Sequence, residues 1–177
     1  PKENIERAIQ RALGGSGALH PQSVEYEVYG PGGVAILANG ITDNPNRTTA
    51  ELKHLVQSSG GRFAEAGSVS WLFERRQAAD FALSEPREEL ELFLIDAGAE
   101  DTAIVENRIE ALVAPTRFES FLSALARRGI TPLGVSSVFT AKNRLTLSEP
   151  DYSAARGLTE ALEDHPDITE VWTNLSE

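Results

Sequence analysis

The order of apolar patterns along the chain predicts an α+β fold. It would contain two α/β sandwiches, the second inserted into the first, and a short N-terminal helix. Residues 78–147 have the pattern of a complete β-α-β-β-α-β unit. When that unit is set aside, the strands and helices of residues 21–77 and 148–177 make up another α/β sandwich. With 41% hydrophobic residues, the chain is apolar enough to build both cores.

Before the inserted unit, the predicted elements are as follows. Apolar residues at helical spacing predict a short helix over residues 1–13, the tail of a helical region that covers residues 1–20. Strands are predicted over residues 22–31 and 33–41, with a glycine-rich break between them. A loop over 43–46 then leads to a helix over 48–59, where Thr48 and Glu51 have capping-box spacing. Alternating apolar residues predict a strand over 68–75.

The inserted unit has strands near residues 80–84, 102–106, 109–113 and 132–141 and helices over 86–97 and 115–128. Gly98 and Gly129 follow the two helices, as glycine commonly does at a helix C-terminus. This order is typical of a ferredoxin-like sandwich. A helix over 150–163 and a strand over 168–174 would then return to complete the first sheet.

Composition excludes several classes of site. The chain has no Cys and only three scattered His residues, so we expect no metal and no cofactor. It has neither a long apolar run nor a secretory signal pattern, which indicates the cytoplasm. The first residues enter a helical pattern without an initiator Met, and we therefore expect further residues upstream.

The net charge of −11 is unevenly distributed along the sequence. Residues 43–77 carry five basic and four acidic residues, whereas residues 78–177 carry eight basic and nineteen acidic ones. A polyanion would be repelled by the second half of the chain. Any nucleic acid must therefore be contacted by the first half, or by residues upstream of it.

Two loops are candidate contact sites for nucleic acid or the ribosome. The first is Tyr29-Gly30-Pro31-Gly32-Gly33, which lacks the lysine and the following helix of a phosphate loop. It is either a tight turn, or a turn that also lets a nucleotide approach closely, with Tyr29 as a stacking face. The second loop consists of Asp43, Asn44, Asn46, Arg47 and Thr48 at a helix start.

Most residues of the second loop suit simple capping, which is the alternative interpretation there. Arg47 is the exception, because neither a cap nor a turn requires a guanidinium, whereas a phosphate does. Further basic residues could line one surface or simply be solvated; they are Lys53, His54, Arg62, Arg75 and Arg76. No serine lies in a nucleophile elbow and no carboxylate pair stands out, so we expect no enzyme.

These segments resemble the YebC family, which includes YebC and PmpR regulators and the mitochondrial translational activator of cytochrome c oxidase. The matching positions are residues 26–33, 42–44, 47–48, 67–69 and 72–73, with weaker matches to residue 171. Val28 replaces a usual glycine, and Pro45 stands where members often carry a basic residue. The resemblance implies a three-domain plan with the third domain inserted into the second, and a basic helical first domain of which this chain has only the tail.

The resemblance implies one of two functions. Some members are described as DNA-binding transcriptional regulators, and others as ribosome-associated factors that help translation through proline runs. Because duplex DNA binding depends on phosphate neutralisation, an acidic chain favours the ribosome or structured RNA. DNA binding is the alternative, and a small-metabolite-sensing module is a further one. We expect no membrane partner, and the oligomeric state is left open.

Overall fold

The computed structural model describes residues 21–83, 86–105 and 107–176. They form two compact units. Unit 1 comprises residues 21–73 and 141–176, and unit 2 comprises residues 74–140. The helix predicted over residues 1–13 lies outside the described residues.

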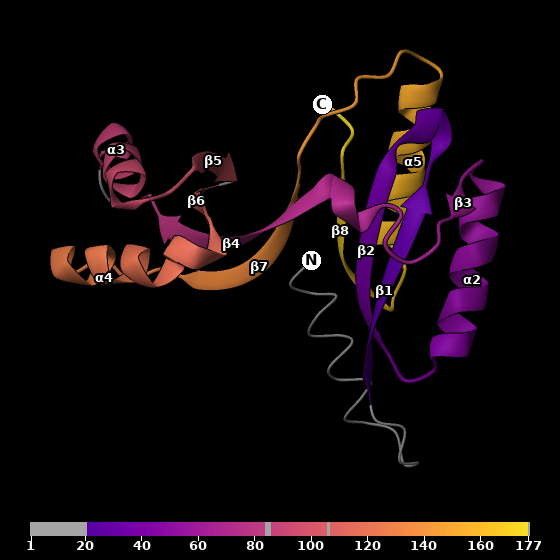
Figure 1. The fold of residues 1–177 in the computed structure, drawn as a ribbon, viewed down its shortest axis with the longest axis horizontal. Helices are drawn as coiled ribbons and strands as arrows, with labels where there is room; N and C mark the ends of the chain where they lie inside the picture. Colours follow the sequence, from indigo (N-terminus) through magenta and orange to yellow (C-terminus); the bar gives the residue numbers. More distant parts are fainter. Residues whose placement is uncertain (1–20, 84–85, 106, 177) are drawn as a thin grey trace. The chain divides into compact units, whose positions relative to one another are not determined.

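Unit 1 is a four-stranded antiparallel sheet with two helices on one face (Figure 1). The strands lie in the order β3-β1-β2-β8. Their bounds are β1 (Gln22–Tyr29), β2 (Ala35–Thr42), β3 (Arg62–Phe63) and β8 (Ile168–Thr173), and the helices are α2 (Pro45–Ser58) and α5 (Asp151–Glu163). The core between sheet and helices is built mainly of apolar side chains, among which Ile36, Leu52 and Leu158 are completely buried.

The pairing of β8 with β2 brings the end of the chain back to the first sheet. Their register is antiparallel, with Leu37 opposite Trp172 and Ala38 opposite Val171. Unit 1 is therefore built from two stretches of chain on either side of unit 2. The two stretches meet again where unit 2 begins and ends, because the amide of Lys142 donates to the carbonyl of Leu72 at 2.9 Å.

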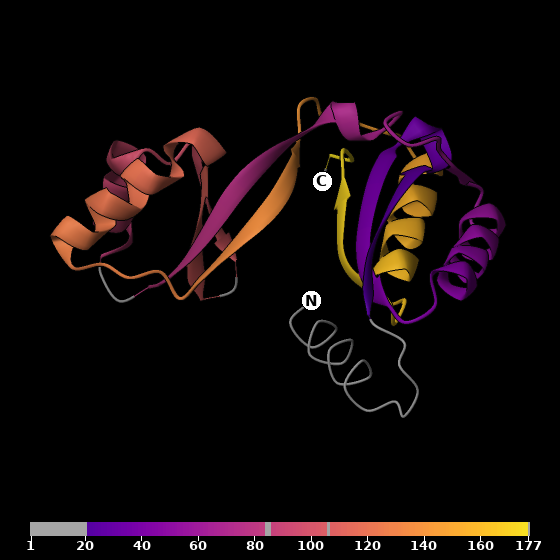
Figure 2. The ribbon, with the colours of Figure 1, turned by 60° about the horizontal axis from the view of Figure 1, so that its bottom comes forward.

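Unit 2 has the β-α-β-β-α-β order predicted for it, with strand order β5-β6-β4-β7. Its elements are β4 (Phe73–Ala82), α3 (Arg87–Ala97), β5 (Asp101–Val105), β6 (Arg108–Val113), α4 (Phe118–Arg128) and β7 (Gly134–Ala141). Both helices cover the same face of the sheet (Figure 2), and Phe81, Leu94 and Phe121 lie at the centre of the core. This strand order is that of a ferredoxin-like sandwich, which confirms the predicted fold class.

The strand predicted over residues 68–75 is wrong. Ser70–Leu72 form a 3-10 turn (η2), and Phe73 begins β4, which also contains the strand predicted over 80–84. Val69 and Phe73 are buried while Trp71 is 62% exposed, so the alternation of apolar residues does not mark one face of a strand. The short strand β3 occupies the edge of the sheet instead, paired with β1.

The start of helix α2 also differs from the prediction. The helix begins at Pro45, and Asn44 is its N-cap, with its side chain accepting a hydrogen bond from the amide of Arg47. Proline suits the first helical position because its fixed φ matches the helix and its missing amide has no helical partner there. Thr48 is consequently a buried residue of the helix rather than its cap.

The boundaries of the two units lie at residues 73/74 and 140/141, earlier in the chain than the predicted 77/78 and 147/148. The first boundary is earlier because residues 74–77 belong to β4. The predicted domains are residues 21–77 with 148–177, and the inserted residues 78–147. That these domains fold separately stays a proposal, which a deletion of unit 2 tests.

Candidate nucleic-acid interface

The glycine-rich segment forms a tight turn between β1 and β2. Pro31–Gly33 are one 3-10 turn (η1), in which Gly32 and Gly33 have φ values of +66° and +82°. A Cβ on Gly32 would lie 2.7 Å from the side chain of Leu147, whereas a Cβ on Gly33 would meet no atom within 4 Å. The group that approaches Gly32 is therefore part of the chain itself, and Gly33 has an open side.

Glu27 organises the segment that follows β3. This segment, residues 64–72, is called the Trp71 loop below, and it crosses the face of the sheet opposite the helices. The Glu27 side chain is buried on that face, where it accepts hydrogen bonds from the amides of Gly67 (2.6 Å), Val69 (2.5 Å) and Ser70 (2.9 Å). Burial acts to raise the pKa of Glu27, but these donors outweigh it and lower the pKa below its ordinary value.

Two aromatic side chains donate to one carbonyl of the Trp71 loop, that of Ser68. The hydroxyl of Tyr29 donates to the carbonyl of Ser68 at 2.7 Å, and the indole Nε1 of Trp71 donates to the same carbonyl at 2.9 Å. The guanidinium of Arg62 lies over the Tyr29 ring, 4.9 Å from its centroid. Lys142 donates from Nζ to the carbonyl of Trp71 at 2.8 Å.

Tyr29, Arg62, Trp71 and Lys142 are together called the aromatic–cationic surface. Arg62, Trp71 and Lys142 are exposed to solvent, and Tyr29 is half-buried. Tyr29 and Arg62 were predicted as site residues from the sequence. Trp71 and Lys142 were missed, because Trp71 was assigned to a strand and Lys142 lies far along the chain.

The second predicted loop is tied into unit 1 by a buried carboxylate, Asp167. Its Oδ2 atom accepts from Arg47 Nη2 at 2.8 Å, Thr48 Oγ1 at 2.7 Å and Thr42 Oγ1 at 3.2 Å. Burial acts to raise the pKa of Asp167, but the hydrogen bonds from Thr48 and Arg47 outweigh it and hold the pKa below its ordinary value. Arg47 thus joins the start of α2 to the segment before β8.

Arg47 is also surrounded by other carboxylates. Asp43 Oδ1 lies 3.1 Å from its Nη2 atom, and Glu51 Oε1 lies 3.9 Å from its Nε atom. Neither a cap nor a turn requires Arg47, as expected from the sequence, but Asp167 gives it a structural role. This partner is distant in sequence. The arginine side chain is nevertheless 45% exposed, so it is partly accessible to solvent.

The predicted site residues fall into separate groups. The glycine-rich turn precedes the start of β2, and the Asp43–Thr48 group follows its end (Figure 1). An eight-residue strand places them roughly 23 Å apart, at about 3.3 Å per step. Asn46 and Lys53 are exposed at and along α2. Arg75 and Arg76 belong to unit 2 and are described separately below.

The two arginines of unit 2 have partners within that unit. Arg76 contacts Glu74 and Glu100, with its Nε 2.7 Å from a Glu100 oxygen. Arg75 lies over the Phe139 ring, 5.3 Å from its centroid. Arg75 is exposed and Arg76 is half-buried. These contacts neutralise Arg76 and leave Arg75 more available to an anion.

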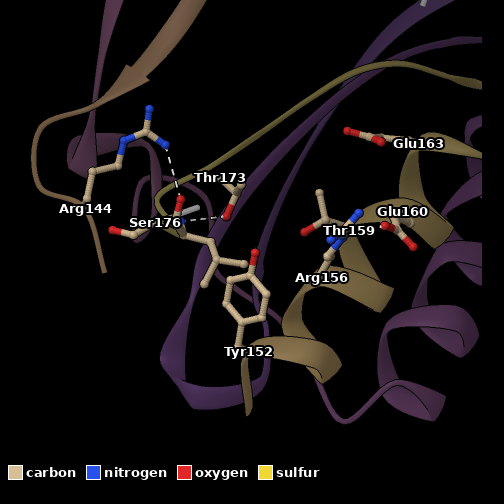
Figure 3. Close-up of a pocket in the computed structure, with 9 residues that line it drawn as sticks. Arg144, Tyr152, Arg156, Thr159, Glu160, Glu163, Thr173 and Ser176 are labelled. Atoms are coloured by element: carbon tan, nitrogen blue, oxygen red, sulfur yellow. Dashed lines mark hydrogen bonds and ion pairs between the residues drawn. The ribbon is translucent and has the colours of Figure 1, made fainter. Parts of the chain in front are cut away.

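A further hollow of about 500 Å³ lies between α5 and the C-terminal segment of unit 1. Figure 3 shows Arg144 on one side of it and Arg156, Glu160 and Glu163 on the other. Arg156 is ion-paired with Glu160 at 2.8 Å, and Arg144 donates to the carbonyl of Leu175 at 3.2 Å. Two arginines and two glutamates line this hollow, so it offers no excess of one sign to a charged ligand.

Within the described residues, no cluster of three or more His, Cys, Asp or Glu side chains is arranged to hold a metal ion. No helix within the same residues has the length and apolar character needed to span a membrane.

Known proteins similar to this chain share its sequence and fold over nearly its whole length. Proteins of Thermotoga maritima and Chloroflexus aurantiacus, each named probable transcriptional regulatory protein, are 41% and 39% identical to it. The matches cover 99% of this chain and 70% and 71% of those proteins. The crystal structure of a conserved hypothetical protein from Aquifex aeolicus has a TM-score of 0.79 at 32% identity, covering 99% of this chain and 73% of that one.

The family model described as the second and third domain of TACO1/YebC matches residues 21–175. The match includes both units and every described residue of the aromatic–cationic surface. It confirms the resemblance seen in the sequence motifs, and the chain therefore belongs to the TACO1/YebC family.

Proposed function

We propose that this chain is part of a non-enzymatic, cytoplasmic regulator of gene expression that binds structured RNA on the ribosome and eases stalling at proline runs. The names of its relatives support a regulatory role. The choice of the ribosome and of proline runs follows the resemblance to the ribosome-associated members of the family.

The distribution of charge is the observation that carries the preference for RNA over duplex DNA. Residues 74–140 contain seven basic and twelve acidic residues, and residues 21–73 with 141–177 contain six and thirteen. Arg47 and Arg76, two of the predicted phosphate contacts, are ion-paired to carboxylates of their own unit. Affinity for a duplex depends on neutralising many phosphates at once, which these two units are poorly equipped to do.

Structured RNA makes a different demand. It is recognised through its shape and through unpaired bases, so a few exposed loops can bind it while acidic surfaces face away. The rigid turn at residues 30–33 and the aromatic–cationic surface supply such loops in unit 1. The second candidate function is DNA-binding transcriptional regulation, which the names of the relatives favour.

The two candidates are separated by parallel binding assays at one salt concentration. The protein is sedimented with ribosomes through a sucrose cushion, and it is run with a promoter-like duplex in a mobility assay. We expect co-sedimentation that weakens as salt is raised, and no shift of the duplex. A shifted duplex under conditions where no protein pellets with ribosomes would exclude the proposal in favour of transcriptional regulation.

The proline-run step needs its own test. In a reconstituted translation reaction, the protein should raise the yield of a reporter that contains a proline run more than that of a matched reporter in which alanines replace the prolines. Because family members carry a basic helical first domain, a longer form that includes one should bind ribosomes more tightly than residues 1–177 at the same salt. Equal affinity would show that the described units alone account for binding.

A further inference from the structure

Trp71 is an isolated exposed aromatic residue. Among the described residues, the large hydrophobic side chains that are exposed are Trp71 and six others, and all six lie in unit 2: Leu92, Ile95, Ile104, Val105, Leu133 and Val135. The exposed fraction of Trp71 is 62%. A protein-binding patch normally has a contiguous apolar centre, which the described residues of unit 1 do not provide around Trp71.

The surroundings of Trp71 are polar and cationic. The indole Nε1 is bonded to the Ser68 carbonyl, to which the Tyr29 hydroxyl also donates. Arg62 lies over the Tyr29 ring, and the ammonium group of Lys142 is bonded to the Trp71 carbonyl. Arg62 and Lys142 make no ion pair with a carboxylate of the described residues. The single acidic residue of the loop sequence itself is Glu65.

The position of the indole ring is set in advance of any binding. Glu27 holds the loop at three points, the amides of Gly67, Val69 and Ser70. The buried side chain of Val69 anchors the loop to the sheet, and the Leu72 amide closes the 3-10 turn on the Val69 carbonyl at 2.9 Å. A ring fixed in this way loses little conformational entropy when a flat ligand stacks on it.

We propose that Trp71 is a stacking platform for one unpaired RNA base, and that Arg62 and Lys142 bind the phosphates on either side of that base. The RNA identity of the ligand rests on the proposed function, whereas the stacking geometry rests on the contacts above. Every base has a π face, so the platform accepts any sequence. A bulged or looped-out nucleotide of structured RNA presents the required base.

The test uses the intrinsic fluorescence of the platform. The chain has two Trp residues, so Trp172→Phe leaves Trp71 as the sole indole. This variant is titrated with an alternating adenosine–cytidine RNA of about ten nucleotides, which cannot pair with itself. We expect the Trp71 emission to be quenched, with the same dissociation constant that anisotropy of the labelled RNA reports for the unmodified chain.

Substitutions then assign the contact. Trp71→Ala should weaken RNA binding by roughly ten- to a hundredfold, the size of one base–aromatic stack, and Trp71→Phe should retain most of the affinity. The matched control is Leu92→Ala, which removes a side chain of similar exposure, 64%, from unit 2 and should leave affinity unchanged. Arg62→Gln should weaken binding and reduce its dependence on salt.

Each alternative result has a distinct meaning. Unchanged RNA affinity in Trp71→Ala, or no quenching on saturation, would overturn the platform. If Trp71→Ala abolishes ribosome co-sedimentation without changing affinity for the RNA, Trp71 docks on a protein and the proposal is wrong. RNA binding through Trp71 in a chain that does not pellet with ribosomes would sustain the platform while excluding the ribosomal function.

Discussion

Glu27→Gln is the substitution that tests the architecture of the Trp71 loop most directly. The two side chains have the same shape, so the change removes the charge and replaces one acceptor oxygen with an NH₂ donor. In the parent, one carboxylate oxygen accepts from Gly67 and the other from Val69 and Ser70. With glutamine, the amide oxygen keeps the Val69 and Ser70 bonds, and the NH₂ group faces the amide of Gly67.

The expected loss of stability follows from these three bonds. Removing the charge weakens each of the two retained hydrogen bonds by about 1 kcal/mol, and leaving the Gly67 amide without its acceptor costs about 1 kcal/mol more. The free energy of unfolding of unit 1 should therefore fall by about 3 kcal/mol. Both Trp residues lie in unit 1, so urea unfolding followed by Trp fluorescence reports on this unit.

The effect should depend on pH in a defined direction. The folded-state pKa of Glu27 is lowered, so the ionised contact stabilises the fold above the unfolded pKa of about 4.3 and is lost as pH falls through the folded value. The difference between parent and variant should be full at pH 7 and shrink below about pH 4. A difference under about 0.5 kcal/mol at pH 7, or one that grows in acid, would refute this account of the loop.

Three further predictions concern unit 1. Asp167→Asn should lower the free energy of unfolding by about 2–4 kcal/mol, because three donors lose a charged acceptor; urea unfolding measures this loss. Gly32→Ala should destabilise the protein by at least about 2 kcal/mol in the same assay, and Gly33→Ala by about 1 kcal/mol, since both have positive φ but only Gly32 is closely approached. Replacing residues 74–140 with a short Asn-Gly turn should leave unit 1 folded, with one cooperative transition in Trp fluorescence.

Controls make these outcomes decisive. Asp43→Asn alters an exposed carboxylate at the same guanidinium and should change stability by less than about 0.5 kcal/mol, because exposed ion pairs contribute little. Equal costs for the two glycine substitutions would mean that Leu147 moves aside freely. A deletion variant that unfolds without a cooperative transition would show that unit 1 needs unit 2 in order to fold. The hydrogen bond between Leu72 and Lys142, which brings the two ends of unit 1 together, would then not be sufficient.

Local patterns in the sequence determined the fold class, most of the helices and strands, and the family. Helical spacing, the glycines after α3 and α4 and the βαββαβ order are short-range features, and the structure has them where they were predicted. The return of the last strand, β8, to the first sheet was also predicted, because the inserted unit is complete without it. The motifs of residues 26–73 were enough to identify the family.

Contacts between residues distant in sequence decided the candidate site. The sequence indicated no partner for Arg47, because Asp167, which it contacts at 2.8 Å, lies 120 positions away along the chain. Trp71 was predicted to belong to a strand, because alternating apolar residues occur both in buried strands and in turns that pack on a sheet. The contact that holds this turn on the sheet joins Glu27 to Val69, 42 positions apart in the sequence. Burial and hydrogen bonding depend on which segments the fold brings together. Only the tertiary structure showed that Trp71 is exposed, that it shares the Ser68 carbonyl with Tyr29, and that Lys142 contacts the Trp71 carbonyl.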